Sequence, residues 1–139
     1  ALTGIKMGAD APQLFKALVE ATAFGARAIT ERFREEGVPI NSVVVIGGIS
    51  KKSDYVMQTC ADVWNCPIDV LESEQSCALG GAIMAAVAAG EYPTVAEAQQ
   101  VMASPVCKQY LPDASKVGIY DELYQNYQPL GDYVSGGKA

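Results

Sequence analysis

Hydrophobic residues recur at steps of three and four along the first quarter of the chain, which is the spacing of one face of an α-helix. The pattern follows Asp10, where Pro12 and Gln13 favour a capped first turn, and it stops before Gly37 and Pro39. A long first helix is therefore predicted, with these apolar positions: Leu14, Phe15, Leu18, Val19, Phe24, Ile29 and Phe33.

Two short apolar runs follow, and each is predicted to be a β-strand. Residues 43–46 are four consecutive β-branched residues, which suits a strand covered on both faces, and residues 67–71 form the second run. A helical pattern spans about residues 54–64 between them, with one face formed by Val56, Met57, Cys60, Ala61 and Trp64. This order predicts an α/β fold with a short sheet flanked by helices.

Residues 77–89 are apolar on every side and mostly small, which predicts a buried helix that ends at Gly90. Gly80 and Gly81 lie inside it, and each glycine costs about 1 kcal/mol relative to alanine. Two explanations are open: tight packing of this helix on the sheet, or close approach of a ligand or a moving partner domain.

The last third of the chain is predicted to hold two helices joined by an irregular connection. The first runs from the cap at Thr94 to about Met102, and the connection covers residues 107–112. From about Ser115 an aromatic stripe at helical spacing is expected to dock the last helix on the domain, with a partner or substrate surface as the alternative: Tyr120, Leu123, Tyr124, Tyr127 and Leu130. Residues 1–103 are thus expected to form the core and residues 104–139 a C-terminal extension, with a loose tail over 136–139.

Composition narrows the functional classes. The chain has 139 residues, half of them hydrophobic, and a net charge of −6, so nucleic acid is not expected as a partner. The longest apolar run, residues 77–89, is shorter than the roughly 20 residues that a membrane span needs, and no signal peptide is visible. We expect no membrane partner, a cytoplasmic location and, because the sequence opens at Ala1 without Met, a piece of a longer protein.

The side chains available for chemistry are few. The absence of histidine excludes Ser-His-Asp and Cys-His nucleophilic sites and any zinc site containing histidine within this chain. The cysteines form no CxxC pair and are expected to be reduced, mostly buried thiols: Cys60, Cys66, Cys77 and Cys107. Asp54 and Asp62, on the predicted helix, are expected to serve as first-turn charge or as solvated surface groups.

The junction at Gly47-Gly48, directly after the first strand, is the strongest candidate site. Two glycines at a strand end that opens into a helix allow backbone N–H groups to approach a phosphate, although a sharp chain turn alone would also explain them. The sequence is neither GxGxxG nor GxxxxGK[ST], so a Rossmann or P-loop site is not indicated. Lys51 and Lys52 follow, where they could reach a phosphate or remain solvated.

In order and spacing, several segments resemble the C-terminal part of the FGGY carbohydrate kinases. They are residues 2–4, residues 14–25, Gly47-Gly48-Ile49 with residues 57–58 and 61–63, and residues 78–82. The resemblance implies a truncated C-terminal half of an actin-like ATPase fold, related to ribonuclease H. Within the family, residues 47–53 and the ending over 110–133 are most similar to the L-ribulokinase subfamily.

The resemblance also implies a function. ATP and magnesium would be used to phosphorylate L-ribulose to L-ribulose 5-phosphate in arabinose breakdown. Gly47 and Gly48 would lie against the α-phosphate and ribose, Ile49, Lys52 and Ser53 would line the adenine side, with Ser53 where these kinases often have Asn, and Gly80 would lie near the nucleotide cleft.

The catalytic base, the sugar contacts and most metal contacts are expected in an N-terminal part that this chain lacks, so no catalytic or metal-binding residue is predicted here. The chain alone is expected to be inactive as a kinase. Its uncovered surfaces are expected to favour self-association. A xylulokinase or glycerol kinase type of enzyme and a non-catalytic nucleotide-binding domain remain as alternatives.

Overall fold

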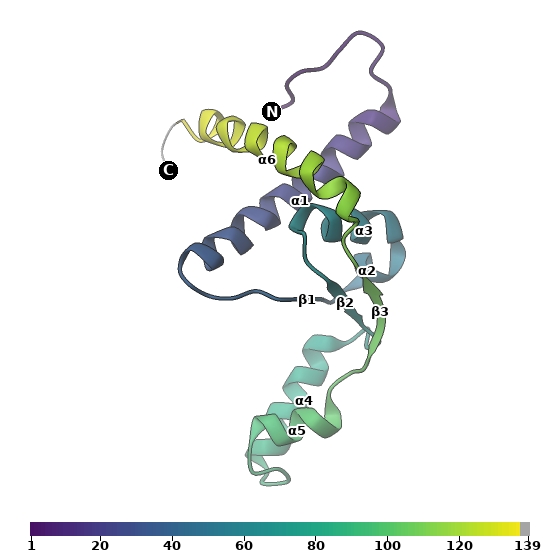
Figure 1. Cartoon of the computed structure of the whole chain (residues 1–139). Coiled ribbons are helices and arrows are strands. Elements are labelled where there is room, and N and C mark those ends of the chain that lie inside the picture. Colours follow the sequence, from purple (N-terminus) through teal and green to yellow (C-terminus); the bar gives the residue numbers. More distant parts are fainter. Residues whose placement is uncertain (137–139) are drawn as a thin grey trace.

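The computed structural model describes residues 1–136, which form six helices and one three-stranded sheet (Figure 1). The elements in chain order are α1 (Ala11–Glu35), β1 (Val43–Val45), α2 (Gly48–Lys52), α3 (Asp54–Trp64), β2 (Ile68–Leu71), α4 (Ser76–Ala88), α5 (Val95–Met102), β3 (Val106–Tyr110) and α6 (Ala114–Val134). The predicted α/β class is confirmed. The tail expected over residues 136–139 lies outside the described residues except for Gly136.

The ends of α1 follow the predicted signals. The Asp10 side chain accepts a hydrogen bond from the Gln13 backbone N–H at 2.9 Å, and the Gln13 side chain accepts one from the Asp10 N–H at 3.3 Å. The helix ends at Glu35, and Gly37 then takes a positive φ of 82°, a conformation that glycine adopts without steric cost. Local sequence alone therefore fixes where this helix begins and ends.

The sheet has the order β1-β2-β3. β1 runs parallel to β2, with Val43 opposite Ile68, and β2 runs antiparallel to β3, with Ile68 opposite Tyr110. The expectation of an irregular connection over residues 107–112 is wrong for residues 107–110, because residues 106–110 form β3.

Among residues 1–136, one face of the sheet is covered and the other is open, so the expectation that β1 is covered on both faces is wrong. Ile68 and Val70 are buried in the core cluster, whereas Val44, on the opposite face, is 56% exposed. Gln109 and Asp69 also lie away from the buried face, and the Gln109 amide donates to the Asp69 carboxylate at 2.7 Å.

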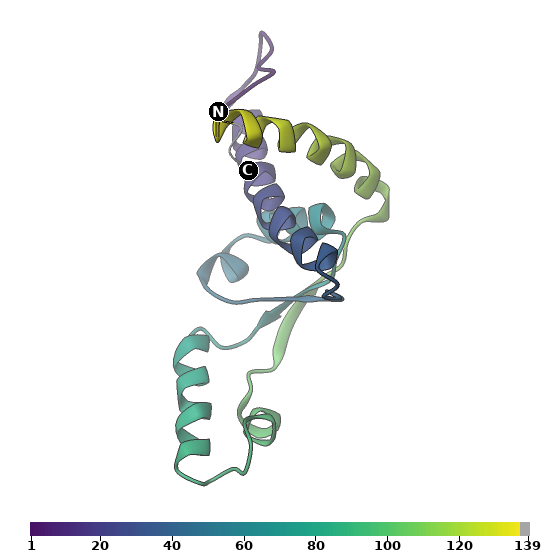
Figure 2. The same cartoon turned by 90° about the vertical axis from the view of Figure 1, so that its left-hand side faces the viewer.

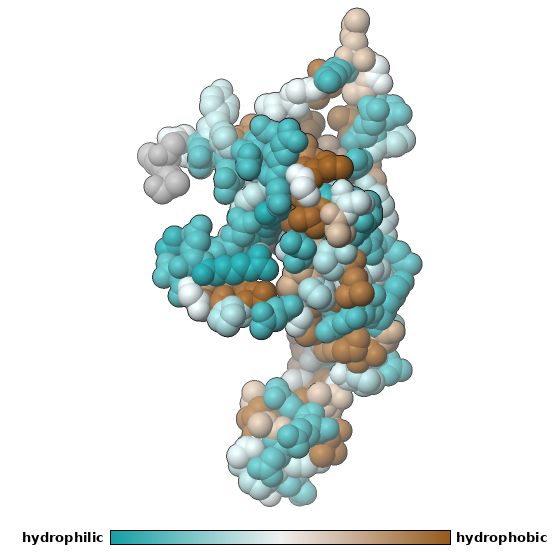
Figure 3. Space-filling view, in the orientation of Figure 1, coloured by the Kyte–Doolittle hydropathy of each residue, from teal (hydrophilic) through white to brown (hydrophobic). Residues whose placement is uncertain are grey.

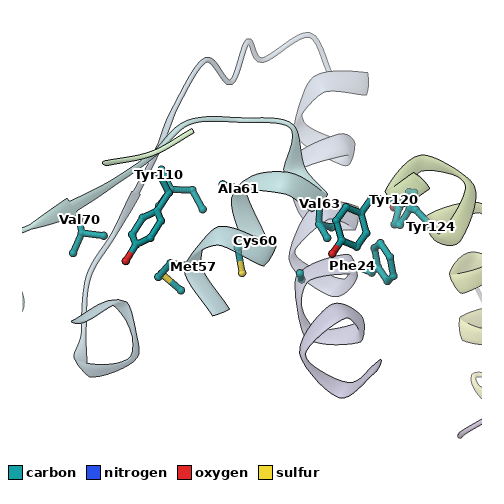
Figure 4. Close-up of a cluster of buried hydrophobic side chains, with 11 residues drawn as sticks. Phe24, Met57, Cys60, Ala61, Val63, Val70, Tyr110, Tyr120 and Tyr124 are labelled. Carbon is teal, nitrogen blue, oxygen red and sulfur yellow. The ribbon is translucent and has the colours of Figure 1, made fainter. Parts of the chain in front are cut away.

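The core lies around α3, which packs between the sheet and the crossed helices α1 and α6 (Figures 1 and 2). Figure 4 shows its two halves: Met57, Val70 and Tyr110 on the sheet side, and Phe24, Tyr120 and Tyr124 where α1 meets α6. The Phe24 ring lies 5.8 Å from the ring of Tyr124, centroid to centroid. The aromatic stripe therefore docks α6 on the domain, as predicted.

Arg27 of α1 makes contacts within α1 and with both α3 and α6. Its guanidinium forms ion pairs with Glu31 at 2.6 Å and Asp121 at 2.7 Å, and it donates to the Val63 carbonyl at 3.1 Å. It also lies 4.5 Å from the centre of the Tyr124 ring, within the range of a cation–π contact. Residues of the C-terminal part thus pack directly on α1 and α3.

The prediction of a buried helix over residues 77–89 is wrong. α4 and α5 form a hairpin set apart from the other helices by a narrow neck, visible in Figures 1 and 3. Ile83 is the buried residue of α4, and a Cβ added at Gly80 or Gly81 would meet no described atom within 4 Å beyond the adjoining residues and backbone of α4 itself. Tight packing on the sheet therefore does not explain these glycines, and close approach of a ligand or another domain stays a prediction.

Apolar side chains are also exposed on α1: Leu14, Phe15, Leu18, Ile29 and Phe33. Burial on this helix is concentrated at Ala23 and Phe24, where α3 and α6 pack on it. Among the described residues, no helix is both long enough and apolar enough to cross a membrane.

The cysteines are divided between the core and the surface. Cys60 and Cys66 are buried, Cys77 and Cys107 are exposed, and all four are free thiols. The expectation of mostly buried thiols is thus wrong for two of them, because α4 and β3 leave one side open.

Candidate functional site

The glycine corner lies between the end of β1 and the start of α2. Gly47 has φ of 98°, which favours glycine, and Gly48 is the first residue of α2. The Gly47 carbonyl accepts hydrogen bonds from the Ser50 hydroxyl at 2.7 Å and the Ser50 N–H at 3.3 Å. Because Ser50 is buried, these two bonds hold the corner in one shape.

A hollow of about 330 Å³ opens at this corner. One wall is formed by Gly47, Gly48, Lys51 and Lys52, and the other by residues 73–75. The walls lie side by side because β1 and β2 are parallel, so the loops that follow the two strands both leave at the carboxyl ends of the strands. Loops at the carboxyl ends of the strands are the usual ligand-binding position in α/β sheets.

The two lysines of the hollow differ in their contacts. The Lys51 ammonium donates to the Glu72 carbonyl and lies 3.9 Å from the Glu74 carboxylate, so it bridges the walls. The Lys52 ammonium lies 4.0 Å from the point where a Cβ on Gly48 would be. Lys52 therefore places a positive charge directly over the glycine corner, where a bound phosphate would be attracted.

The predicted site residues fall into two groups. Gly47, Gly48 and Lys52 lie together in the hollow. Ile49 is 53% exposed and Ser53 caps α3 by accepting from the Val56 N–H at 3.3 Å, so both flank the hollow without lining it. Gly80 lies on exposed α4, one turn beyond its first residue, and no described contact joins it to the corner.

Sequence reasoning missed Ser50 and the opposite wall, residues 73–75. A serine three residues after a glycine turn is a frequent partner for a turn carbonyl, and this signal was available. The polar turn over residues 72–76 was also visible, and parallel pairing of its strand with the first one would have placed it beside the corner.

Asp54 and Asp62 have different environments. Asp54 begins α3, as expected, and accepts hydrogen bonds from Lys108 at 2.8 Å and Tyr110 at 2.9 Å, which lower the pKa of its carboxyl. Asp62 is only 2% exposed, so the expectation of a solvated surface group is wrong. Its carboxylate accepts from Gln58 at 2.7 Å, from the Asp113 N–H at 2.9 Å and from Lys116 at 3.1 Å.

Metal-binding side chains do not gather at the corner. Within residues 1–136, no group of three or more His, Cys, Asp or Glu side chains could hold a metal ion. Glu74 is the carboxylate in the wall of the hollow, and it already faces Lys51.

Comparison with known families identifies the first two thirds of the chain. Residues 1–89 match the C-terminal domain of the FGGY family of carbohydrate kinases. The chain belongs to this family. The matched region of this FGGY chain includes the whole glycine corner and its opposite wall.

Curated relatives align with nearly the whole FGGY chain. A ribulokinase of Vibrio parahaemolyticus serotype O3:K6 (strain RIMD 2210633) is 49% identical over 134 residues, which are 96% of this chain and 24% of that protein. A ribulokinase of Shouchella clausii (strain KSM-K16) is 39% identical over 145 residues, an alignment that covers 99% of this chain and 26% of that protein. The chain thus spans about a quarter of the length of these relatives.

Solved structures confirm the fold. A xyloylose kinase from Brucella ovis superposes with a TM-score of 0.85 at 25% identity, over 98% of this FGGY chain and 28% of that one. Plasmodium falciparum glycerol kinase with ADP superposes with a TM-score of 0.73 at 18% identity, over 91% of this chain and 25% of that one. The fold is therefore that of the C-terminal part of an actin-like ATPase, as predicted.

Proposed function

We propose that this chain supplies the nucleotide side of an ATP-dependent sugar kinase, with the nucleotide phosphates at the glycine corner. The observation that carries the proposal is the hollow between the loops after β1 and β2, with Lys52 above Gly48. The first N–H groups of a helix have no partner within the helix, so Gly48 and Ile49 can offer theirs to a phosphate. Membership of a carbohydrate kinase family supports the same assignment.

The sugar that we propose is L-ribulose, phosphorylated to L-ribulose 5-phosphate in arabinose breakdown. The support is that curated relatives with 49% and 39% identity are ribulokinases. Magnesium would accompany ATP and neutralise its phosphates. Free thiols at all four cysteines agree with a reducing cytoplasm, where we place the enzyme.

We further propose that the chain alone does not transfer the phosphoryl group. Phosphoryl transfer needs a carboxylate that orients the attacking hydroxyl, together with groups that stabilise charge on the transferred phosphate. Asp54 is engaged by Lys108 and Tyr110, and Asp62 is buried among its own partners, so neither is available as that base. Incubation of the chain with MgATP and L-ribulose should give no product above background.

Nucleotide binding can be tested at one position. Calorimetric titration of the chain with ADP should give a saturable signal, and Gly48→Asp should weaken binding by about tenfold or more because it places a carboxylate beside the phosphates. The matched control is Gly48→Ala, whose methyl group would lie 3.9 Å from Lys52, an ordinary contact, so its fold should be intact. Equal ADP affinity in wild type and Gly48→Asp would contradict the proposal.

A further inference from the structure

The wall of the hollow that faces the glycine corner is a loop, residues 73–75, which connects β2 to α4. Glu74 and Gln75 are exposed, so packing does little to hold them in place. Gln75 is the N-cap residue of α4, and among the described residues its side chain makes no capping hydrogen bond. The position of this wall therefore depends on the hydrogen bonds that its backbone makes with other parts of the chain.

Two hydrogen bonds join this wall to the residues that precede β3. The Glu72 N–H donates to the Pro105 carbonyl at 2.9 Å, and the Ser73 N–H donates to the Ser104 hydroxyl at 2.8 Å. The Ser104 hydroxyl in turn donates to the Pro105 carbonyl at 3.4 Å. This hydroxyl thus accepts from one segment and donates within the other, so it is engaged both as an acceptor and as a donor.

The two bonds extend the antiparallel ladder of β2 and β3 beyond its last pair, Leu71 opposite Val106. Two positions further along, Ser73 comes opposite Ser104. Pro105 lies between them and the last pair, and because proline has no N–H it cannot return a backbone hydrogen bond, so regular pairing stops. The Ser104 side chain then supplies the acceptor that a strand backbone would otherwise offer to the Ser73 N–H.

Ser73 connects this anchor to the rest of the wall. Its hydroxyl accepts a hydrogen bond from the Gln75 N–H at 3.2 Å, and its carbonyl accepts one from the Ser76 hydroxyl at 3.2 Å. The Glu74 carboxylate, which lies between these two bonds in the sequence, is 3.9 Å from the Lys51 ammonium on the other wall. A displacement of Ser73 would therefore move the whole wall relative to the glycine corner.

Given that the hollow is the nucleotide site proposed above, we propose that Ser104 is a positioning residue for that site. Its hydroxyl holds residues 73–75 at the distance from the glycine corner that a bound nucleotide needs, although Ser104 itself does not line the hollow. Ser104 also lies beyond residues 1–89, the region that matches the FGGY C-terminal domain. The gain is preorganisation, because a wall that is already ordered loses less conformational entropy when the nucleotide binds.

The test measures two quantities: the hydrogen-exchange rate of the Ser73 amide by NMR without nucleotide, and the ADP affinity by calorimetry. Ser104→Ala should speed the exchange about tenfold and weaken ADP binding about three- to tenfold, as expected for one lost hydrogen bond. Ser104→Thr keeps the hydroxyl, and a β-branched residue suits the extended backbone before proline, so it should restore both values. The matched control, Ser135→Ala at the exposed end of α6, should behave as wild type in both.

Urea unfolding guards against a folding defect, and Ser104→Ala should keep the midpoint of wild type because Ser104 is only half-buried. If Ser104→Ala lowers the midpoint, Ser104→Cys replaces it in both measurements, since a thiol of similar size accepts hydrogen bonds only weakly. Equal ADP affinity or equal Ser73 exchange in wild type and the variant, or a loss of affinity that Ser104→Thr does not restore, would overturn the proposal. A wild-type chain that binds no ADP, with Ser73 exchange still faster in Ser104→Ala, would instead refute the nucleotide site, and with it this role of Ser104, while leaving the loop contact established.

Discussion

At the scale of single residues, the glycine corner depends on three side chains with different tasks. Ser50 fixes the Gly47 carbonyl from inside, Lys51 bridges to the opposite wall, and Lys52 lies over Gly48. The position of the diglycine turn could be predicted from the sequence because it follows a β-branched strand. The different contacts of Lys51 and Lys52 could not be predicted, since they depend on where the Glu72–Glu74 turn lies in space.

This division predicts unequal effects of removing each lysine charge. Lys52→Met should weaken ADP binding by about five- to tenfold, because an exposed charge near a phosphate contributes on the order of 1 kcal/mol. Lys51→Met should weaken it less, since this ammonium already faces Glu74. Calorimetry with Lys6→Met as the remote control measures both effects, and a larger loss for Lys51→Met than for Lys52→Met would contradict the assignment.

The four thiols should also differ in reactivity. Burial raises the pKa of Cys60 to about 11 and raises the pKa of Cys66, and only the thiolate reacts with a disulfide reagent. At pH 8 the native chain should therefore show two fast thiols, Cys77 and Cys107, and two slow ones. Absorbance after addition of Ellman's reagent counts them, and guanidinium-unfolded chain, with four fast thiols, is the control. Four fast thiols in the native chain would show that the core is open.

At the scale of elements, α3 is held at both ends by the C-terminal part of the chain. Asp54 at its start contacts Lys108 and Tyr110 of β3, and Asp62 near its end contacts Lys116 of α6. The tyrosine spacing was enough to predict α6, because its buried face repeats at the helical period. β3 gave no such signal, since four of its five residues are exposed and pairing with β2 alone defines it.

The Asp62 contacts should be important for stability. Asp62→Ala leaves the Gln58 amide and the Asp113 N–H without their buried acceptor, so we expect unfolding to become easier by about 3 kcal/mol. Asp132→Ala, on an exposed part of α6, is the control and should change the free energy of unfolding by less than about 0.5 kcal/mol. Urea unfolding followed by circular dichroism measures both, and equal values would show that α6 docks without this cluster.

At the scale of the whole molecule, the chain exposes surfaces that sheets and amphipathic helices usually cover. β1 is an edge strand with Val44 exposed, and α1 exposes Leu14, Leu18 and Phe33. The α/β class and the corner were predictable because they follow from local patterns. The exposure of one sheet face and of α4 could not be predicted from the sequence. Hydrophobic composition indicates that a segment is normally buried, but it does not show whether residues of this same chain pack against it.

These open surfaces predict self-association. Light scattering should detect dimers or larger species at concentrations of tens of micromolar, because edge strands and apolar faces pair between chains. Val44→Lys on the β1 edge should shift the population toward monomer, whereas Val101→Lys on exposed α5 adds the same charge elsewhere and should have little effect. A wild-type chain that is strictly monomeric throughout this range would contradict the prediction.

The most direct test of the central claim is a crystal structure of the chain grown with ADP. We predict phosphate oxygens within hydrogen-bonding distance of the Gly48 and Ile49 N–H groups, and the Lys52 ammonium turned toward them. ADP bound elsewhere, with the hollow at Gly47 and Gly48 filled by side chains from residues 73–75, would contradict the account.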